Sequence, residues 1–183
     1  SAPASAAMRC TKRDATIANS MATSKGSYAE NFKQIETGFL DSNQLQVAPD
    51  GSFEIILSAT PKPGNWLPMD ADSQSLLIRQ TFMDRSSEIP AEITIERADA
   101  GATPDPLTAE TFDRNLGTAA RFIGNTARLF ADWAASYRGR PNELPPADQK
   151  VCHAAGGDPN IFYYHSYFEL AGDEALVIEV ERI

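Results

Sequence analysis

The stretch that decides the fold is Asp50-Gly51-Ser52-Phe53-Glu54-Ile55-Ile56-Leu57-Ser58, whose part from Phe53 onward is rich in Ile and Phe. That composition is typical of a β-strand. Residues 76–83 predict a second strand, and because both faces of its alternating pattern are largely apolar, we expect it to be central. Residues 93–97 alternate between apolar and polar side chains, which predicts a strand with one face in water.

The segments around these strands contain turn signals. Residues 59–75 form a loop in which three prolines fix the backbone and remove hydrogen-bond donors, so this stretch cannot be a central strand. Trp66 lies in this stiff loop, directly after Gly64-Asn65. Residues 28–48 predict two short strands separated by turns. Residues 1–25 are polar with weak periodicity, and we expect poor order or an edge segment there.

After a linker rich in Gly and Pro, the spacing of apolar residues changes from two to three or four. The new period predicts a long amphipathic helix that begins at a Thr108 cap and ends at Gly139-Arg140-Pro141. The apolar stripe consists of Phe112, Leu116, Ala119, Ile123, Ala127, Phe130, Ala134 and Tyr137, widened by Phe122, Leu129 and Trp133.

The last part of the chain returns to a strand pattern. Residues 161–170 and 175–183 predict two strands, and Gly172-Asp173 supplies a turn, so the pair is expected to form a β-hairpin. Strands, one long helix and strands again indicate an α+β domain that is mainly β, in the form of an antiparallel β-sandwich. We expect one domain over residues 26–183 with a helical insertion at about 108–138.

Composition excludes several classes of function. The 183 residues carry a formal net charge of −9, which disfavours nucleic acid and anionic membrane surfaces as partners. No apolar run approaches the roughly 20 residues of a membrane helix. Cys10 and Cys152 are expected to be thiols rather than a disulfide. With two His and no dense carboxylate cluster, neither a metal nor a cofactor is expected.

Several motifs carry a family resemblance. They are residues 126–138 of the helix, Pro141-Asn142-Glu143-Leu144, residues 155–161 with Tyr163-Tyr164-His165, and residues 173–179, together with the three strands and the Trp66 loop described above. In this order they resemble the domain-of-unknown-function family numbered 1214, which is often found with a companion numbered 1254.

That resemblance implies a jelly-roll-like β-sandwich with helical embellishments, and it implies no agreed reaction. The relatives look longer at both ends, with more strands after residue 179. This chain is therefore expected to be a shortened member, a fragment, or a unit whose sheet is completed by another chain. An unfinished sheet would leave an open edge that needs covering.

Two groups of candidate site residues stand out. Trp66 is either an aromatic platform at a pocket mouth or a plug at the end of the sandwich. Arg79 lies in an apolar strand and needs a carboxylate partner; Glu54, Glu92, Glu96 and Glu179 are the candidates on neighbouring strands. It either binds a ligand carboxylate or forms a structural ion pair.

The remaining candidates lie near the end of the chain. Asp158 and Asn160 follow two glycines and either bind a ligand or form a turn. Tyr163, His165 and Tyr167 share one face of the predicted strand, so His165 is a candidate acid or base if that face lines a cavity; otherwise the face is structural or contacts another subunit. No nucleophile elbow accompanies them.

Three functions are compatible with these residues. The first is a module that binds a small organic ligand with carboxylate or hydroxyl groups through Trp66, Arg79, Asn160 and Tyr163. The second is a small-molecule enzyme that uses His165 with Asp158. The third is a structural subunit that completes its sheet with another chain. We expect a homo-oligomer in the cytoplasm, with the periplasm or secretion as the alternatives.

Overall fold

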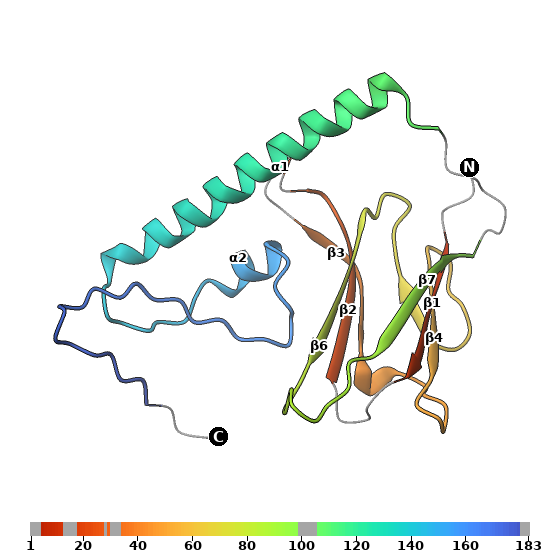
Figure 1. Cartoon of the computed structure of the whole chain (residues 1–183), viewed down its shortest axis with the longest axis horizontal. Coiled ribbons are helices and arrows are strands. Elements are labelled where there is room, and N and C mark those ends of the chain that lie inside the picture. The colour runs from red at the N-terminus through yellow and green to blue at the C-terminus, as the bar shows by residue number, and fades with distance from the viewer. Residues whose placement is uncertain (1–4, 13–17, 28, 30–33, 99–105, 180–183) are drawn as a thin grey trace.

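The residues of the deciding stretch form β4 (Phe53–Ser58), an inner strand of a four-stranded sheet in the computed structural model (Figure 1). The structure describes residues 5–12, 18–27, 29, 34–98 and 106–179. The strand order of this first sheet is β5-β4-β1-β7, where the other strands are β1 (Ala6–Lys12), β5 (Trp66–Pro68) and β7 (Glu92–Arg97). β1 pairs antiparallel with both neighbours, and β5 runs parallel to β4.

A second sheet of three strands has the order β3-β2-β6, formed by β2 (Ala18–Lys25), β3 (Ile35–Asp41) and β6 (Ser75–Thr81). Both pairings are antiparallel. The described residues therefore contain seven strands in two sheets, and with one long helix the fold is α+β and mostly β. A jelly roll has about eight strands, so that more specific topology stays a prediction.

The hydrophobic core lies between the two sheets. Met8, Ile55 and Leu67 from the first sheet pack with Met21 and Leu40 from the second, and all five are buried. These residues lie on one face of each strand, because successive side chains of a strand point to opposite faces. On the opposite face of the first sheet, Arg9 of β1 bonds Glu54 of β4 at 2.5 Å and Glu96 of β7 at 2.7 Å.

The two sheets approach each other closely at Gly38. A Cβ atom there would lie 2.1 Å from the carbonyl oxygen of Pro68, so no larger residue fits without moving the backbone. Thr23 of β2 donates a hydrogen bond to the same oxygen at 2.6 Å. Gly38 therefore lets β3 of one sheet pass directly against β5 of the other.

The described residues also contain four helical segments. The 3-10 turn η1 (Ser42–Gln44) carries a capping box with Asp41. Helix α1 (Ala109–Ser136) begins at Thr108, whose side chain accepts from the backbone N–H of Thr111. It is followed by η2 (Tyr137–Gly139) and by α2 (Gln149–Ala154). The predicted long helix is thus confirmed.

Helix α1 has an amphipathic sequence but no buried residue. It runs obliquely past the sandwich and reaches beyond it toward the C-terminal segment (Figure 1). Phe112, Leu116, Ile123 and Phe130 of its apolar stripe are each more than half exposed. One described link to the sandwich side is the hydrogen bond from Asn125 Nδ2 to the carbonyl oxygen of Ala29, at 3.3 Å.

Three expectations need correction. We expected residues 1–25 to be an edge segment or poorly ordered, but β1 and β2 are the inner strands of their sheets, since the small and polar residues there pair with apolar strands on both sides. We expected residues 76–83 to be central, but β6 lies at a sheet edge. Residues 161–179 contain no strand, and their ordered pairing is limited to two isolated bridges, Pro141 with Tyr167 and Pro146 with Tyr164.

The core makes a direct prediction for stability. Replacing Ile55, which is fully buried, with Ala should lower the free energy of unfolding by about 2–5 kcal/mol, because it removes apolar contacts and leaves a cavity. Ile89→Ala is the matched control, since Ile89 is 51% exposed, and should cost less than about 1 kcal/mol. Urea denaturation measures both; equal costs would contradict the placement of the core.

Candidate functional site

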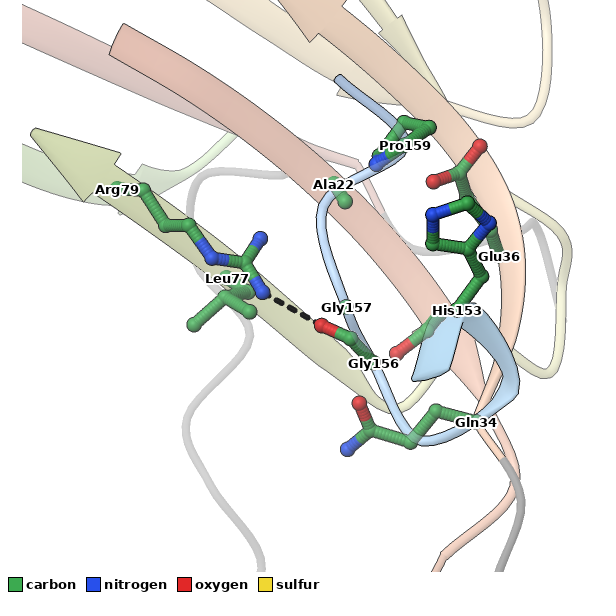
Figure 2. A pocket seen from close by; sticks show the side chains of 10 residues that line it. Ala22, Gln34, Glu36, Leu77, Arg79, His153, Gly156, Gly157 and Pro159 are labelled. Carbon is green, nitrogen blue, oxygen red and sulfur yellow. Dashed lines mark hydrogen bonds between the residues drawn. The ribbon is translucent and has the colours of Figure 1, made fainter. Parts of the chain in front are cut away.

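A small polar pocket lies where the loop after α2 covers the three-stranded sheet. It lies over β2, with Glu36 of β3 and Arg79 of β6 on either side and the loop that contains Gly156 and Gly157 across it (Figure 2). Its volume is about 30 Å³, which is room for one water-sized group. The lining residues are Ala22, Ser24, Gln34, Glu36, Leu77, Arg79, His153, Gly156, Gly157 and Pro159.

Asp158 anchors the loop to the sheet. Its side chain is buried, and its Oδ2 accepts a hydrogen bond from the hydroxyl of Ser20 on β2. Its Oδ1 accepts from the backbone N–H of Asn160 at 2.9 Å, and its own backbone N–H donates to the Tyr163 hydroxyl at 2.8 Å. A buried carboxylate needs such partners, because an unsatisfied buried charge is costly. Asp158 thus joins the C-terminal part of the chain to the sandwich.

Arg79 forms the second connection between sheet and loop. Its Nη2 donates to the carbonyl oxygen of Gly156 at 2.5 Å, and its Nη1 lies 3.8 Å from Oδ2 of Asp158. The partner predicted from neighbouring strands was therefore wrong. Glu54 and Glu96 are engaged by Arg9, whereas the loop, which is distant in sequence, brings the carboxylate that Arg79 meets.

The two glycines of the loop are required by close packing and by backbone conformation. Gly156 has φ +87°, a region that side chains disfavour. A Cβ atom on Gly157 would lie 2.7 Å from the carbonyl oxygen of Cys152 and 3.0 Å from the Tyr163 hydroxyl. The loop can therefore lie flat over the sheet and close the pocket because neither position carries a side chain.

Glu36 of β3 contributes the most perturbed carboxyl group of the pocket. The residue as a whole is exposed, but its carboxyl group lies beside His153 at the pocket (Figure 2). Removal of water raises the pKa of Glu36 above its ordinary 4.5, the charge of Asp158 raises it further, and His153 partly offsets this. The neutral form of Glu36 is therefore favoured more than in an exposed glutamate.

His153 supplies an unsatisfied atom. Its Nε2 is buried and has no hydrogen-bond partner among the described residues, and its ring meets that of Tyr163 edge-on at 6.0 Å between centroids. Buried polar atoms in folded proteins nearly always have a partner. An atom in the pocket able to bond this nitrogen would satisfy it.

His165 belongs to a neighbouring aromatic cluster rather than to the lining of the pocket. Its Nδ1 is 2.6 Å from the hydroxyl of Tyr137, and its ring meets Trp133 edge-on at 5.1 Å. Burial raises the pKa of Tyr137, so this phenol stays protonated at neutral pH and can donate to the imidazole. The Tyr163 ring lies near both histidines: its centroid is 6.0 Å from that of His153 and 6.4 Å from that of His165.

The other predicted residues lie apart from the pocket. Trp66 is in β5 of the first sheet, where its Nε1 donates to the carbonyl oxygen of Ser58 at 3.1 Å; this is the geometry expected of a structural plug. Asn160 is exposed, and its side chain donates to Asp41 at 3.2 Å. Of the six predicted site residues, the structure brings together Arg79, Asp158 and Tyr163.

The sequence reasoning missed Glu36 and His153. No spacing signal in the sequence connects His153 to a glutamate more than a hundred residues earlier. No group of three or more His, Cys, Asp or Glu residues in the described part of the chain could hold a metal ion. No disulfide joins Cys10 and Cys152, which are both buried. Among the described helices, none is long and apolar enough to span a bilayer.

The chain is similar to a protein of known structure. The crystal structure of an uncharacterised protein from Burkholderia cenocepacia is 50% identical in sequence and superposes with a TM-score of 0.89. The match covers 94% of this chain and 48% of that one, so this chain spans about half the length of its relative. No family model and no curated protein matches the chain.

The packing of the loop predicts the effect of one added methyl group. Gly157→Ala should lower the free energy of unfolding by about 1–3 kcal/mol, because the new Cβ would overlap the backbone of Cys152. Gly172→Ala is the matched control, since nothing lies within 4 Å of its Cβ position. It should change stability by less than about 0.5 kcal/mol. Thermal unfolding of both variants decides; an unaffected Gly157 variant would refute the close contact.

The raised pKa of Glu36 predicts a pH-dependent stability. Because the folded state holds this proton more tightly than the unfolded state, stability falls as pH rises from about 4.5 through the raised pKa. Glu36→Gln removes that loss, so its melting temperature should exceed the wild-type value at pH 7. The difference should shrink toward zero below pH 4.

Melting curves from pH 3.5 to 8 test this, with Glu92→Gln on the exposed side of β7 as the control. A Glu36→Gln variant that is less stable than the wild type at pH 7, or a difference that does not change with pH, would contradict the origin proposed for the shift.

Proposed function

We propose that the chain is a β-sandwich module that binds a small organic molecule by one hydroxyl group in the Glu36–His153–Arg79 pocket. The observation that carries this proposal is that His153 lines the pocket while its buried Nε2 has no partner among the described residues. A ligand group that fills the pocket would remove that energetic cost.

The size and charge of the pocket favour a hydroxyl. A volume of about 30 Å³ admits one small polar group rather than a whole organic molecule, so the rest of the ligand would lie toward the open side. A carboxylate would face the negative charge of Asp158 and the carboxyl group of Glu36. A hydroxyl can donate to one group and accept from another, which suits a pocket with both kinds of partner.

We also propose that the chain is related to the domain-of-unknown-function family numbered 1214. The motifs that support this relation include residues 126–138 of α1 and residues 155–161, which form the loop that covers the pocket. Such a relation assigns no reaction. The enzymatic alternative stays a prediction as well: the hydrogen bond of His165 goes to Tyr137, and the carboxylate of Asp158 is engaged by Ser20 and Asn160. The compartment also stays a prediction.

A second candidate function is that of a structural subunit in a larger assembly. The observation that favours it is the exposed apolar stripe of α1, where Ile123 is 68% and Leu116 is 59% exposed. Soluble proteins seldom leave contiguous apolar surface of this kind uncovered. This function and the ligand pocket use different surfaces, so both can hold for the same chain.

Side-chain NMR tests the ligand proposal. The His153 ring signals should shift saturably when glycerol or lactate is added at millimolar concentration, and acetate, which lacks a hydroxyl, should have a weaker effect. In a His153→Phe variant, which keeps the ring packed on Tyr163, the response of neighbouring pocket residues should disappear. His165→Phe is the matched control and should leave it intact.

Two outcomes would overturn the hydroxyl assignment: shifts that are linear in concentration for every probe, and a response that survives in the His153→Phe variant. A stronger response to acetate than to glycerol would instead assign a carboxylate and refute the charge argument.

A further inference from the structure

The apolar side chains that α1 and the C-terminal segment leave exposed form what we name the open face. It comprises Phe112, Leu116, Ile123 and Phe130 of α1 and the exposed apolar residues of 161–179, among them Val177 at 76% exposed. The two parts meet where the Trp133 ring packs against His165. This inference rests on the structural-subunit function and is independent of the ligand pocket.

The described contacts of α1 are too few to hold a helix of this length in position. Its 28 residues span about 42 Å at 1.5 Å per residue, and none of them is buried. Helices in proteins owe most of their stability to packing of an amphipathic face. The apolar stripe of α1 is therefore a packing surface whose counterpart lies outside the described residues.

The C-terminal segment has the sequence of strands but lacks their pairing. Residues 161–170 and 175–179 are rich in the aromatic and β-branched residues typical of strands, yet residues 175–179 form no backbone hydrogen bond to any other described residue. A strand exists only beside another strand, since its backbone groups must be paired. The strand-like sequence and the missing backbone pairing agree if these residues pair with the edge of a sheet that lies outside the described residues.

The similarity to the Burkholderia cenocepacia protein indicates what supplies that edge. A TM-score of 0.89 over 94% of this chain requires α1 and the C-terminal segment to lie in nearly the same place in both proteins. The matched part does not itself cover them. More than half of the other chain, however, lies outside the match, and polypeptide there is available to hold the helix in position.

We propose that the open face docks a polypeptide unit equivalent to the unmatched half of that protein. The partner offers the open edge of an antiparallel sheet whose apolar face packs on α1. Residues 161–170 and 175–179 then become strands of the shared sheet, and the expected hairpin forms on docking. This mode is strand addition, in which main-chain hydrogen bonds join two units.

Hydrogen exchange on two intact proteins tests the proposal. In this chain alone, the amides of residues 175–179 should exchange nearly as fast as in an unfolded peptide. In the full-length Burkholderia cenocepacia protein, the aligned amides should exchange at least about 100-fold more slowly. The amides aligned with residues 109–124 of α1 should be slowed as well, whereas those of the inner strand β1 should be protected in both proteins.

The outcomes distinguish whether a polypeptide docks on the open face from whether it docks by strand addition. Protection of the α1 amides without protection of those aligned with 175–179 would keep the structural-subunit function and overturn strand addition. Equally fast exchange of both segments in both proteins would overturn both. Neither result bears on the NMR test of the ligand pocket.

Sedimentation of this chain between 1 and 100 µM tests whether a second copy of the chain occupies the open face instead. The docking proposal predicts a monomer, in contrast to the homo-oligomer expected from the sequence. A dimer that Ile123→Asp abolishes and that Arg121→Asp, on the opposite side of α1, leaves intact would assign the open face to a second copy, and would overturn the proposal of a different polypeptide unit.

Discussion

The buried carboxylate of Asp158 is the interaction on which the placement of the C-terminal part of the chain depends. It accepts a hydrogen bond from the Ser20 hydroxyl of β2 and lies near the Arg79 guanidinium of β6. In the same loop, the carbonyl oxygen of Gly156 accepts a hydrogen bond from that arginine. Removing one partner of such a group leaves a buried charge without compensation, which costs more than the contact itself contributes. The pocket exists because this contact holds the loop against the sheet.

Local sequence predicted the elements whose stability is local. Residues 53–58 carry the β-propensity that β4 uses, and the cap at Thr108 and the period of apolar residues gave the bounds of α1 nearly to the residue. β1 and β2 were harder to predict because their small and polar residues become inner strands only through neighbours from other parts of the chain. The hairpin after residue 160 was the opposite case, in which a clear strand pattern pairs with other described residues only at two isolated bridges.

The candidate site was predictable one residue at a time but not as a group. Arg79 stood out as a charge in an apolar strand, and Asp158 as an acid beside two glycines, yet nothing in the sequence places them 3.8 Å apart. Glu36 and His153 showed no signal, since a raised carboxyl pKa and an unsatisfied imidazole nitrogen arise from burial in the folded chain. Trp66 attracted attention because of its rigid loop, and its indole is bonded to the backbone of β4.

The order of the elements along the chain has a consequence for biosynthesis. All seven described strands lie within residues 6–97, and the open face lies within residues 112–179. Because a ribosome releases the N-terminal part first and domains fold as units, the sandwich can fold before the open face emerges. The nascent chain then presents that surface on an already rigid body, which shortens the interval in which it could associate with the wrong neighbour.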